Sequence, residues 1–303
     1  MMAIPLGQFL AVLSAICFAA SSVFIAKGAK GGGDRGVIFS ALVTLVFALV
    51  LWLVIDGGQL PAENNLELWW GLFWFAMAGL LSVVIGRTLV YASIRKLGVT
   101  RSSAVKKATP FFSVLFALII LEELLGLWNW VGVATMAFAF ILLTWKSFQK
   151  LSAAERAITP DAIDYTWGLG GAVVYALSYI CRKLGLEFIA SPAFGTMISA
   201  LIGFFSFVVL AFFSTRYRDH FRNLFRNLNI WLVLAAIAIS SGQILIFAAL
   251  FHEAVAVVIM INSLEIFFAS FMAVVIFRTE KRPDPMTAIA AMVAFFAVVL
   301  IVL

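Results

Sequence analysis

Long apolar runs recur along the whole chain and constrain its fold more than any other feature. A helix needs about 20 apolar residues to cross a bilayer core about 30 Å thick. Hydrophobic residues make up 64% of the 303 residues and charged residues 12%, against roughly 45–50% and 25% in soluble proteins. We predict ten membrane spans, at Pro5 to Ala26, Gly36 to Ile55, Leu68 to Ala92, Thr100 to Leu121, Trp128 to Trp145, Tyr165 to Ile180 or a little beyond, Ala193 to Phe213, Ile230 to Leu250, Ala254 to Phe277 and Met286 to Leu303.

The spans are predicted to be helices. The runs are continuous rather than alternating, which excludes a transmembrane sheet. Lipid offers the backbone no hydrogen-bond partners, so each peptide N–H must be satisfied within its own helix. We therefore predict an all-α integral membrane protein with ten transmembrane helices. The connections are too short for a catalytic domain outside the lipid, which disfavours pumps and receptors with soluble modules.

Basic residues are divided unequally between the two sides of the predicted membrane. The cytoplasmic connections of membrane proteins accumulate Lys and Arg. Sixteen of the 21 basic residues fall in odd-numbered connections: Lys27, Lys30, Arg35, Arg95, Lys96, Arg101, Lys146, Lys150, Arg156, Arg216, Arg218, Arg222, Arg226, Arg278, Lys281 and Arg282. The opposite side carries only Arg182 and Lys183. We predict that the odd connections face the cytoplasm and both termini lie outside. The net charge of +6 therefore needs no nucleic acid partner.

The two halves of the chain are related by an offset of about 156 residues, which favours an internal duplication. The offset places Gly86 on Gly242, Tyr91 on Phe247, Val99 on Val255 and Phe111-Phe112 on Phe267-Phe268. We predict one five-helix repeat over residues 1–150 and a second over residues 160–303. Because five is odd, the second repeat is predicted to enter the membrane upside down. Inverted repeats are typical of transporters, whose substrate site lies near the bilayer midplane.

Two segments resemble helices of the drug/metabolite transporter superfamily. The stretch Ser103-Ala-Val-Lys-Lys-Ala-Thr-Pro-Phe-Phe, ending at Glu122-Glu123, resembles the fourth helix, and Ile259-Met-Ile-Asn-Ser-Leu-Glu-Ile-Phe-Phe resembles the ninth. Nearly the whole chain is similar to the ten-helix EamA-type plan. The resemblance implies secondary transport of a small organic solute, usually export, by alternating access in a bacterial inner (plasma) membrane. Many such proteins are basic between helices 2 and 3, where this chain is acidic.

Ionisable side chains inside the spans are candidate functional residues. A charge at midspan costs at least about 2.5–3.5 kcal/mol and usually faces a cavity or a partner. Lys106 and Thr109 are three residues apart, as are Asn262 and Glu265, so each pair shares a helix face. The offset places Lys106 on Asn262 and Thr109 on Glu265. Arg87 is a further charge inside a span.

The expected ligand follows from these charges together with a second resemblance. The segment around Lys106 resembles the fourth helix of the plastidic triose-phosphate translocators, in which a lysine at the matching position binds phosphate. Those proteins have a Lys-Arg pair in helix 9 where this chain has Glu265-Ile266, and positive charge is what a phosphate requires. A Lys at one pole and a Glu at the other suit a zwitterion, such as an amino acid or a related metabolite.

Several alternatives stay open at this point. The chain could exchange organic anions or phosphorylated metabolites, or act as a non-transporting membrane scaffold or sensor. Lys106 and Glu265 could also form a structural ion pair. Tyr91, Tyr175 and Tyr179 are the aromatic candidates for ligand contact.

Enzymatic activity is not expected, because the spans hold no histidine, carboxylate pair or zinc-protease motif. No cofactor or metal is expected either. The chain has no phosphate-binding loop for ATP. Protons, bound through Glu265, or a counter-substrate are the candidate coupling partners. The expected partners are thus a small-molecule substrate and the lipid bilayer.

Overall fold

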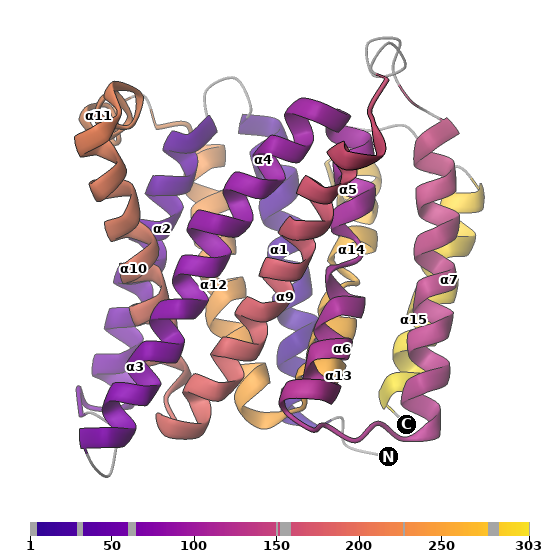
Figure 1. The fold of residues 1–303 in the computed structure, drawn as a ribbon, viewed down its shortest axis with the longest axis horizontal. Helices are drawn as coiled ribbons and strands as arrows, with labels where there is room; N and C mark the ends of the chain where they lie inside the picture. The colour runs from indigo at the N-terminus through magenta and orange to yellow at the C-terminus, as the bar shows by residue number, and fades with distance from the viewer. Residues whose placement is uncertain are drawn as a thin grey trace. The chain divides into compact units, whose positions relative to one another are not determined.

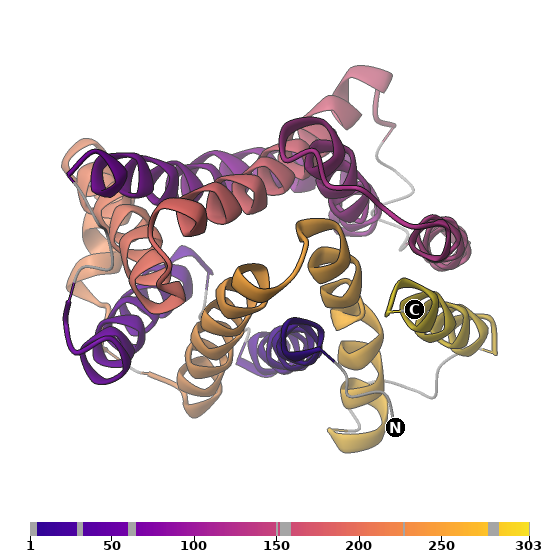
Figure 2. The same ribbon diagram turned by 90° about the horizontal axis from the view of Figure 1, so that it is seen from below.

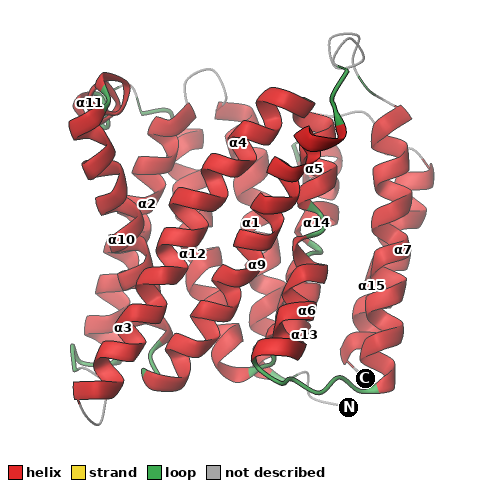
Figure 3. Cartoon of the chain, viewed as in Figure 1, coloured by secondary structure: helices red, strands yellow, loops and turns green. Residues whose placement is uncertain are grey.

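The computed structural model describes residues 5–28, 33–59, 65–149, 151, 159–226, 228–277 and 285–302. Every regular element within these ranges is helical, in agreement with the all-α prediction (Figures 1 and 3). Six of the predicted cytoplasmic bases lie outside the described residues: Lys30, Lys150, Arg156, Arg278, Lys281 and Arg282.

The first half of the chain contains α1 (Leu6–Gly28), α2 (Gly33–Ile55), α3 (Asn65–Gly79), the π-helix η1 (Leu80–Ile85), α4 (Gly86–Leu97), α5 (Val99–Lys106), α6 (Thr109–Ile120) and α7 (Leu127–Gln149). The second half contains the short 3₁₀ turn η2 (Ala162–Asp164), α9 (Tyr165–Phe188), α10 (Pro192–Phe213), α11 (Thr215–Arg222), α12 (Ile230–His252), α13 (Val255–Asn262), α14 (Glu265–Phe271), the π-helix η3 (Met272–Ile276) and α15 (Pro285–Val302).

Within the described part of the chain, nine helical stretches are long and apolar enough to cross a membrane. They correspond to nine of the ten predicted spans. The stretch from Asn65 to Leu97 has 33 residues, because α3, η1 and α4 follow one another without a break. The remaining predicted span is α9, which has 24 residues. At 1.5 Å per residue it is about 36 Å long, so its length also suffices for a bilayer core.

Helix α9 continues to Phe188, whereas the sequence predicts that this span ends at Ile180 or a little beyond. Arg182 and Lys183, which the sequence places in an outer connection, lie inside the helix. The apolar spacing explains the difference, because Leu184 and Phe188 continue the row of residues four apart that includes Ile180. The charged pair interrupts the run of apolar residues but not its helical period.

The chain divides into two compact units, each described here by itself. Unit 1 comprises Met1–Leu80, Cys181–Glu253 and Glu265–Glu280. In this unit α1 packs along α12, and α10 packs against α2 and α3. The buried hydroxyl of Ser14 donates to the carbonyl oxygen of Gly242 at 2.9 Å, while the hydroxyls of Thr44 and Ser240 lie 2.9 Å apart. Such small polar residues let membrane helices approach closely.

Unit 2 comprises Leu81–Ile180, Ala254–Leu264 and Lys281–Leu303. Helices α7 and α15 lie side by side in both views (Figures 1 and 2), and the side-chain amide of Asn129 donates to the carbonyl oxygen of Ile301 at 2.7 Å. Helix α6 packs against α13, and α4 against α5. Each unit thus takes helices from both halves of the sequence.

Candidate functional site

The fourth predicted span is interrupted between α5 and α6, beside Lys106. Pro110 stands in the first turn of α6 and has no N–H, so it cannot donate to the carbonyl oxygen of Lys106 four residues earlier. The hydroxyl of Thr109 donates to that oxygen instead, at 2.8 Å. The sequence therefore ends one helix at Lys106 and begins another at Thr109, and Lys106 is the last residue of α5.

The ninth predicted span is interrupted at the repeat-related place. Helix α13 ends at Asn262 and α14 begins at Glu265. The offset that relates the two halves places Lys107 and Ala108, which separate α5 from α6, on Ser263 and Leu264, which separate α13 from α14. Here the hydroxyl of Ser263 donates to the carbonyl oxygen of Met260 at 2.6 Å. Discontinuous helices in corresponding positions of two repeats are the usual frame of a transporter site.

Glu123 fixes how α13 lies beside α6. Its carboxylate accepts hydrogen bonds from the backbone N–H groups of Val255 at 2.7 Å and Ala256 at 3.1 Å, at the start of α13. A carboxylate there also interacts favourably with the helix dipole. Because Glu123 follows α6 closely, the end of α6 lies at the start of α13, and the two packed helices run antiparallel. Both breaks therefore lie at the end of the α6–α13 pair remote from Glu123.

The side chain of Lys106 approaches Tyr175 within unit 2. Its Nζ lies 5.1 Å from the centroid of the Tyr175 ring, within range of a cation–π interaction. The ring edge is close to α4 as well, because a Cβ placed on Gly86 would lie 3.0 Å from it. Arg87 follows Gly86 in α4 and has a buried guanidinium nitrogen, Nη1, with no hydrogen-bond partner among the described residues. The structure thus brings Lys106, Tyr175 and the start of α4 together.

Glycines hold α9 close to α4 over this region. A Cβ on Gly168 would lie 2.8 Å from Oγ of Ser93, and one on Gly171 would lie 3.1 Å from the side chain of Val90. Together with the Gly86 contact to Tyr175, these contacts show that α4 and α9 run antiparallel in close packing. Tyr91 lies four residues after Arg87 in α4, and Tyr179 lies four residues after Tyr175 in α9, so each pair shares a face of its helix.

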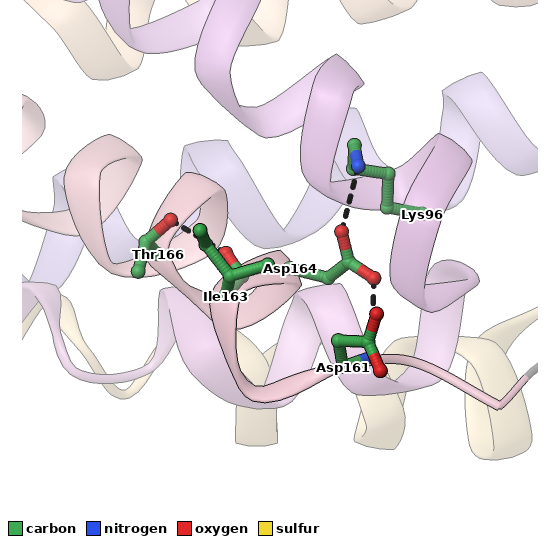
Figure 4. A network of polar contacts seen from close by, with 5 residues as sticks. All are labelled: Lys96, Asp161, Ile163, Asp164 and Thr166. Carbon is green, nitrogen blue, oxygen red and sulfur yellow. Dashed lines mark hydrogen bonds and ion pairs between the residues drawn. The ribbon is translucent and has the colours of Figure 1, made fainter.

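An ion pair ties the same two helices at one end. Nζ of Lys96, near the end of α4, lies 2.7 Å from a carboxylate oxygen of Asp164 in η2, immediately before α9 (Figure 4). The hydrogen bond from Lys96 holds the pKa of Asp164 below its usual range. The second carboxylate oxygen accepts from the backbone N–H of Asp161 at 3.2 Å. This network positions α9, and therefore Tyr175, against α4.

The other predicted site residues fall in different surroundings. Thr109 and Asn262 are both buried in unit 2. The side-chain oxygen of Asn262 is buried and has no hydrogen-bond partner among the described residues, so the second break contains an unsatisfied hydrogen-bond acceptor. Glu265 is the first residue of α14 and belongs to unit 1.

Arg182 is a buried cation, although the sequence predicts it in an outer connection. It is 4% exposed in unit 1, and its guanidinium carbon lies 4.9 Å from the centroid of the Phe247 ring. The signal that identifies it is the helical spacing of apolar residues beyond Ile180. Among the described residues, no group of three or more His, Cys, Asp or Glu side chains is placed to hold a metal ion.

Comparisons with known proteins agree with this architecture. A search of curated proteins found no match. Solved structures share the fold: one crystal structure superposes with a TM-score of 0.68 at 11% sequence identity, covering 97% of this chain and 95% of that chain. The sequence pattern of the EamA-like transporter family matches the chain twice, over residues 5–145 and 163–303. The chain has the two-repeat architecture of that family and belongs to the EamA-like transporter family.

Proposed function

We propose that the protein is a secondary transporter that exports an amino acid or a related zwitterion by alternating access. The observation that carries this proposal is the pair of repeat-related helix breaks, with Lys106 beside one and Asn262 and Glu265 beside the other. A broken helix presents unpaired backbone groups and side chains to a ligand at membrane depth. Asn262 is seven residues after Val255, the first residue of α13, so it lies about 10 Å from the start of that helix.

The charged residues at the breaks take complementary roles in this proposal. Lys106 binds the carboxylate of the ligand, and Tyr175 orients the lysine by contact with its ring. Glu265 binds the ammonium group and exchanges a proton during the cycle. Asn262 and Thr109 supply hydrogen bonds, while Arg87, Tyr91 and Tyr179 extend the binding site along α4 and α9. The cytoplasmic side is that of the odd-numbered connections, because most of the basic residues lie there.

The test is counterflow into proteoliposomes loaded with unlabelled solute. The panel contains amino acids, organic anions and phosphorylated metabolites, each offered outside as a radioactive tracer. We expect transient accumulation of one or more amino acids by the native protein. We expect Lys106→Ala and Glu265→Ala to lower it at least about tenfold, the loss that corresponds to about 1.4 kcal/mol of binding free energy.

The matched control is Lys146→Ala, which removes a lysine from the last turn of α7, outside the proposed binding site. We expect this variant to accumulate the tracer at close to the native rate. If the native protein accumulates no member of the panel, the transport proposal is wrong. If it accumulates phosphate esters alone, the preference for a zwitterion is wrong.

A further inference from the structure

Two aromatic rings flank the ammonium group of Lys27 in unit 1, and a third ring packs against both of them. Its Nζ lies 4.5 Å from the centroid of the Trp231 ring and 4.4 Å from that of Phe277. Phe24 completes the cluster, with ring centroids 6.0 Å from Trp231 and 5.6 Å from Phe277. Trp231 and Phe277 contact each other edge to face at 6.2 Å. We call these four residues the Lys27 cage.

The Lys27 cage joins three separate helical segments. Phe24 and Lys27 lie at the end of α1, Trp231 lies at the start of α12, and Phe277 directly follows η3. A cation over two ring faces gains more where water is partly excluded, and all four side chains are half-buried. Lys27 belongs to the bases of the predicted cytoplasmic side, so the cage lies at that end of unit 1.

Two of the three segments are held together along their whole length. Helices α1 and α12 are joined at the middle by the hydrogen bond from Ser14 to Gly242. At the far end the side-chain amide of Gln8 donates to the carboxylate of Glu253 at 3.4 Å. Lys183 of α9 also anchors the end of α12, because its Nζ donates to the carbonyl oxygens of Leu250 at 2.8 Å and Glu253 at 3.1 Å. Helices α1 and α12 therefore form one rigid pair.

The third segment has a joint at each end. It begins at Glu265, directly after the helix break at Ser263 and Leu264. It ends in the π-helix η3, where the N–H of Phe277 donates to the carbonyl oxygen of Met272 five residues earlier, at 2.9 Å. Short π-helical segments often mark functional sites in helices. Of the three segments that meet at the cage, this one is the best suited to move.

We propose that the Lys27 cage is a latch that holds the segment from Glu265 to Phe277 against α1 and α12. While the latch is closed, the segment from Glu265 to Phe277 stays packed against α1 and α12 at this end of unit 1. When Phe277 leaves the cage, the segment turns about its two joints and carries Glu265 with it. The latch rests on the proposed function only in that its opening would admit or release a ligand on the predicted cytoplasmic side.

The experiment measures the distance across the latch by pulsed electron spin resonance on the full-length protein in lipid nanodiscs, without ligand. Spin labels replace Ile25 and Val275, which are both exposed, after Cys17 and Cys181 have been exchanged for alanine. We expect one dominant short distance in the parent protein, with the open state at about 0.1–10% of the population. In Lys27→Met we expect a longer distance to become the major population.

Three comparisons make the outcome decisive. Lys27→Arg keeps a cation that binds aromatic faces, and we expect it to retain the short distance. Phe277→Leu removes a ring but keeps the charge, and we expect this variant to show the longer distance, as Lys27→Met does. Because the two variants test the same prediction, it remains testable if one of them does not fold. A label pair at Phe9 and Phe251, which are both exposed on the rigid pair, should not change.

The latch proposal is wrong if Lys27→Met keeps the short distance, or if Lys27→Arg opens as much as Lys27→Met. A change at the Phe9 and Phe251 pair would also overturn it, because α1 and α12 would then be separating. The measurement uses neither substrate nor transport. The latch proposal can therefore be wrong while counterflow is observed, and it can be right while no counterflow is observed.

Discussion

At the scale of single residues, a few polar groups in apolar surroundings define the site. Lys106, Thr109 and Asn262 are predicted from the sequence as candidate site residues, because polar groups inside a membrane span usually face a cavity or a partner. The structure adds that the hydroxyl of Thr109 donates to the carbonyl oxygen of Lys106, to which Pro110 cannot donate because it has no N–H. Arg182 was missed because its position depends on where α9 ends, and the end of a helix is set by packing more than by local composition.

Replacing Asn262 should have opposite effects on the stability of the protein and on its transport activity. Its buried side-chain oxygen has no hydrogen-bond partner among the described residues, so Asn262→Leu removes an unsatisfied polar group. We expect the free energy of unfolding to rise by about 1 kcal/mol, while the concentration of ligand needed for half-maximal counterflow rises at least about tenfold. Thermal unfolding and counterflow measure the two effects. Lower stability with unchanged counterflow would show that Asn262 is only structural.

The ion pair between Lys96 and Asp164 predicts a pH dependence. The pKa of Asp164 is lowered by Lys96, so folding is favoured by this group above its unfolded pKa of about 3.9. The contribution is lost as the pH falls through the lower folded pKa. In thermal unfolding, Asp164→Asn should be slightly less stable than the native protein at pH 7, and the difference should vanish towards acidic pH. A difference that grows towards acidic pH would contradict this assignment.

At the scale of helical elements, the two breaks differ in how far the sequence predicts them. Pro110 predicts a disturbance in the fourth span, and the structure places the interruption at Lys107 and Ala108, with Thr109 between it and the proline. The break at Ser263 and Leu264 has no proline or glycine to mark it. It could be inferred only through its relation to the first break by the offset of about 156 residues.

Replacing Pro110 with alanine tests whether the first break matters for function. The new N–H can donate to the carbonyl oxygen of Lys106, so we expect α5 and α6 to merge and the protein to become more stable. Spin labels at Ser103 and Leu115 should then approach the about 18 Å backbone separation of a straight helix over twelve residues. We expect counterflow to fall about tenfold or more. A straight helix with native counterflow would exclude a role for the break.

At the scale of the whole molecule, the sequence repeats and the packed units divide the chain differently. The family pattern matches two consecutive segments, and an offset within one sequence is enough to predict the duplication. Each compact unit instead combines parts of both segments. That exchange could not be predicted from the sequence, because it depends on contacts between distant helices such as α1 with α12 and α6 with α13.

The distribution of basic residues predicts the orientation of the molecule in the membrane. We expect a reporter enzyme fused after Leu303 to be active when it requires an extracytoplasmic location and inactive when it requires the cytoplasm. Adding four lysines after Leu303 should reduce the fraction of correctly inserted protein. Activity of the cytoplasmic reporter alone would reverse the assignment, and with it the side on which the Lys27 cage lies.

The central claim is that a zwitterion binds with its carboxylate at Lys106 and its ammonium group at Glu265. The most direct measurement compares three ligands with three proteins: the transported amino acid, its decarboxylated amine and its deaminated acid, each binding to the native protein, Lys106→Ala and Glu265→Gln. We predict that Lys106→Ala weakens binding of the amino acid and the acid at least about tenfold but not of the amine. Glu265→Gln should weaken binding of the amino acid and the amine but not of the acid. Equal losses for all three ligands in both variants would contradict the claim.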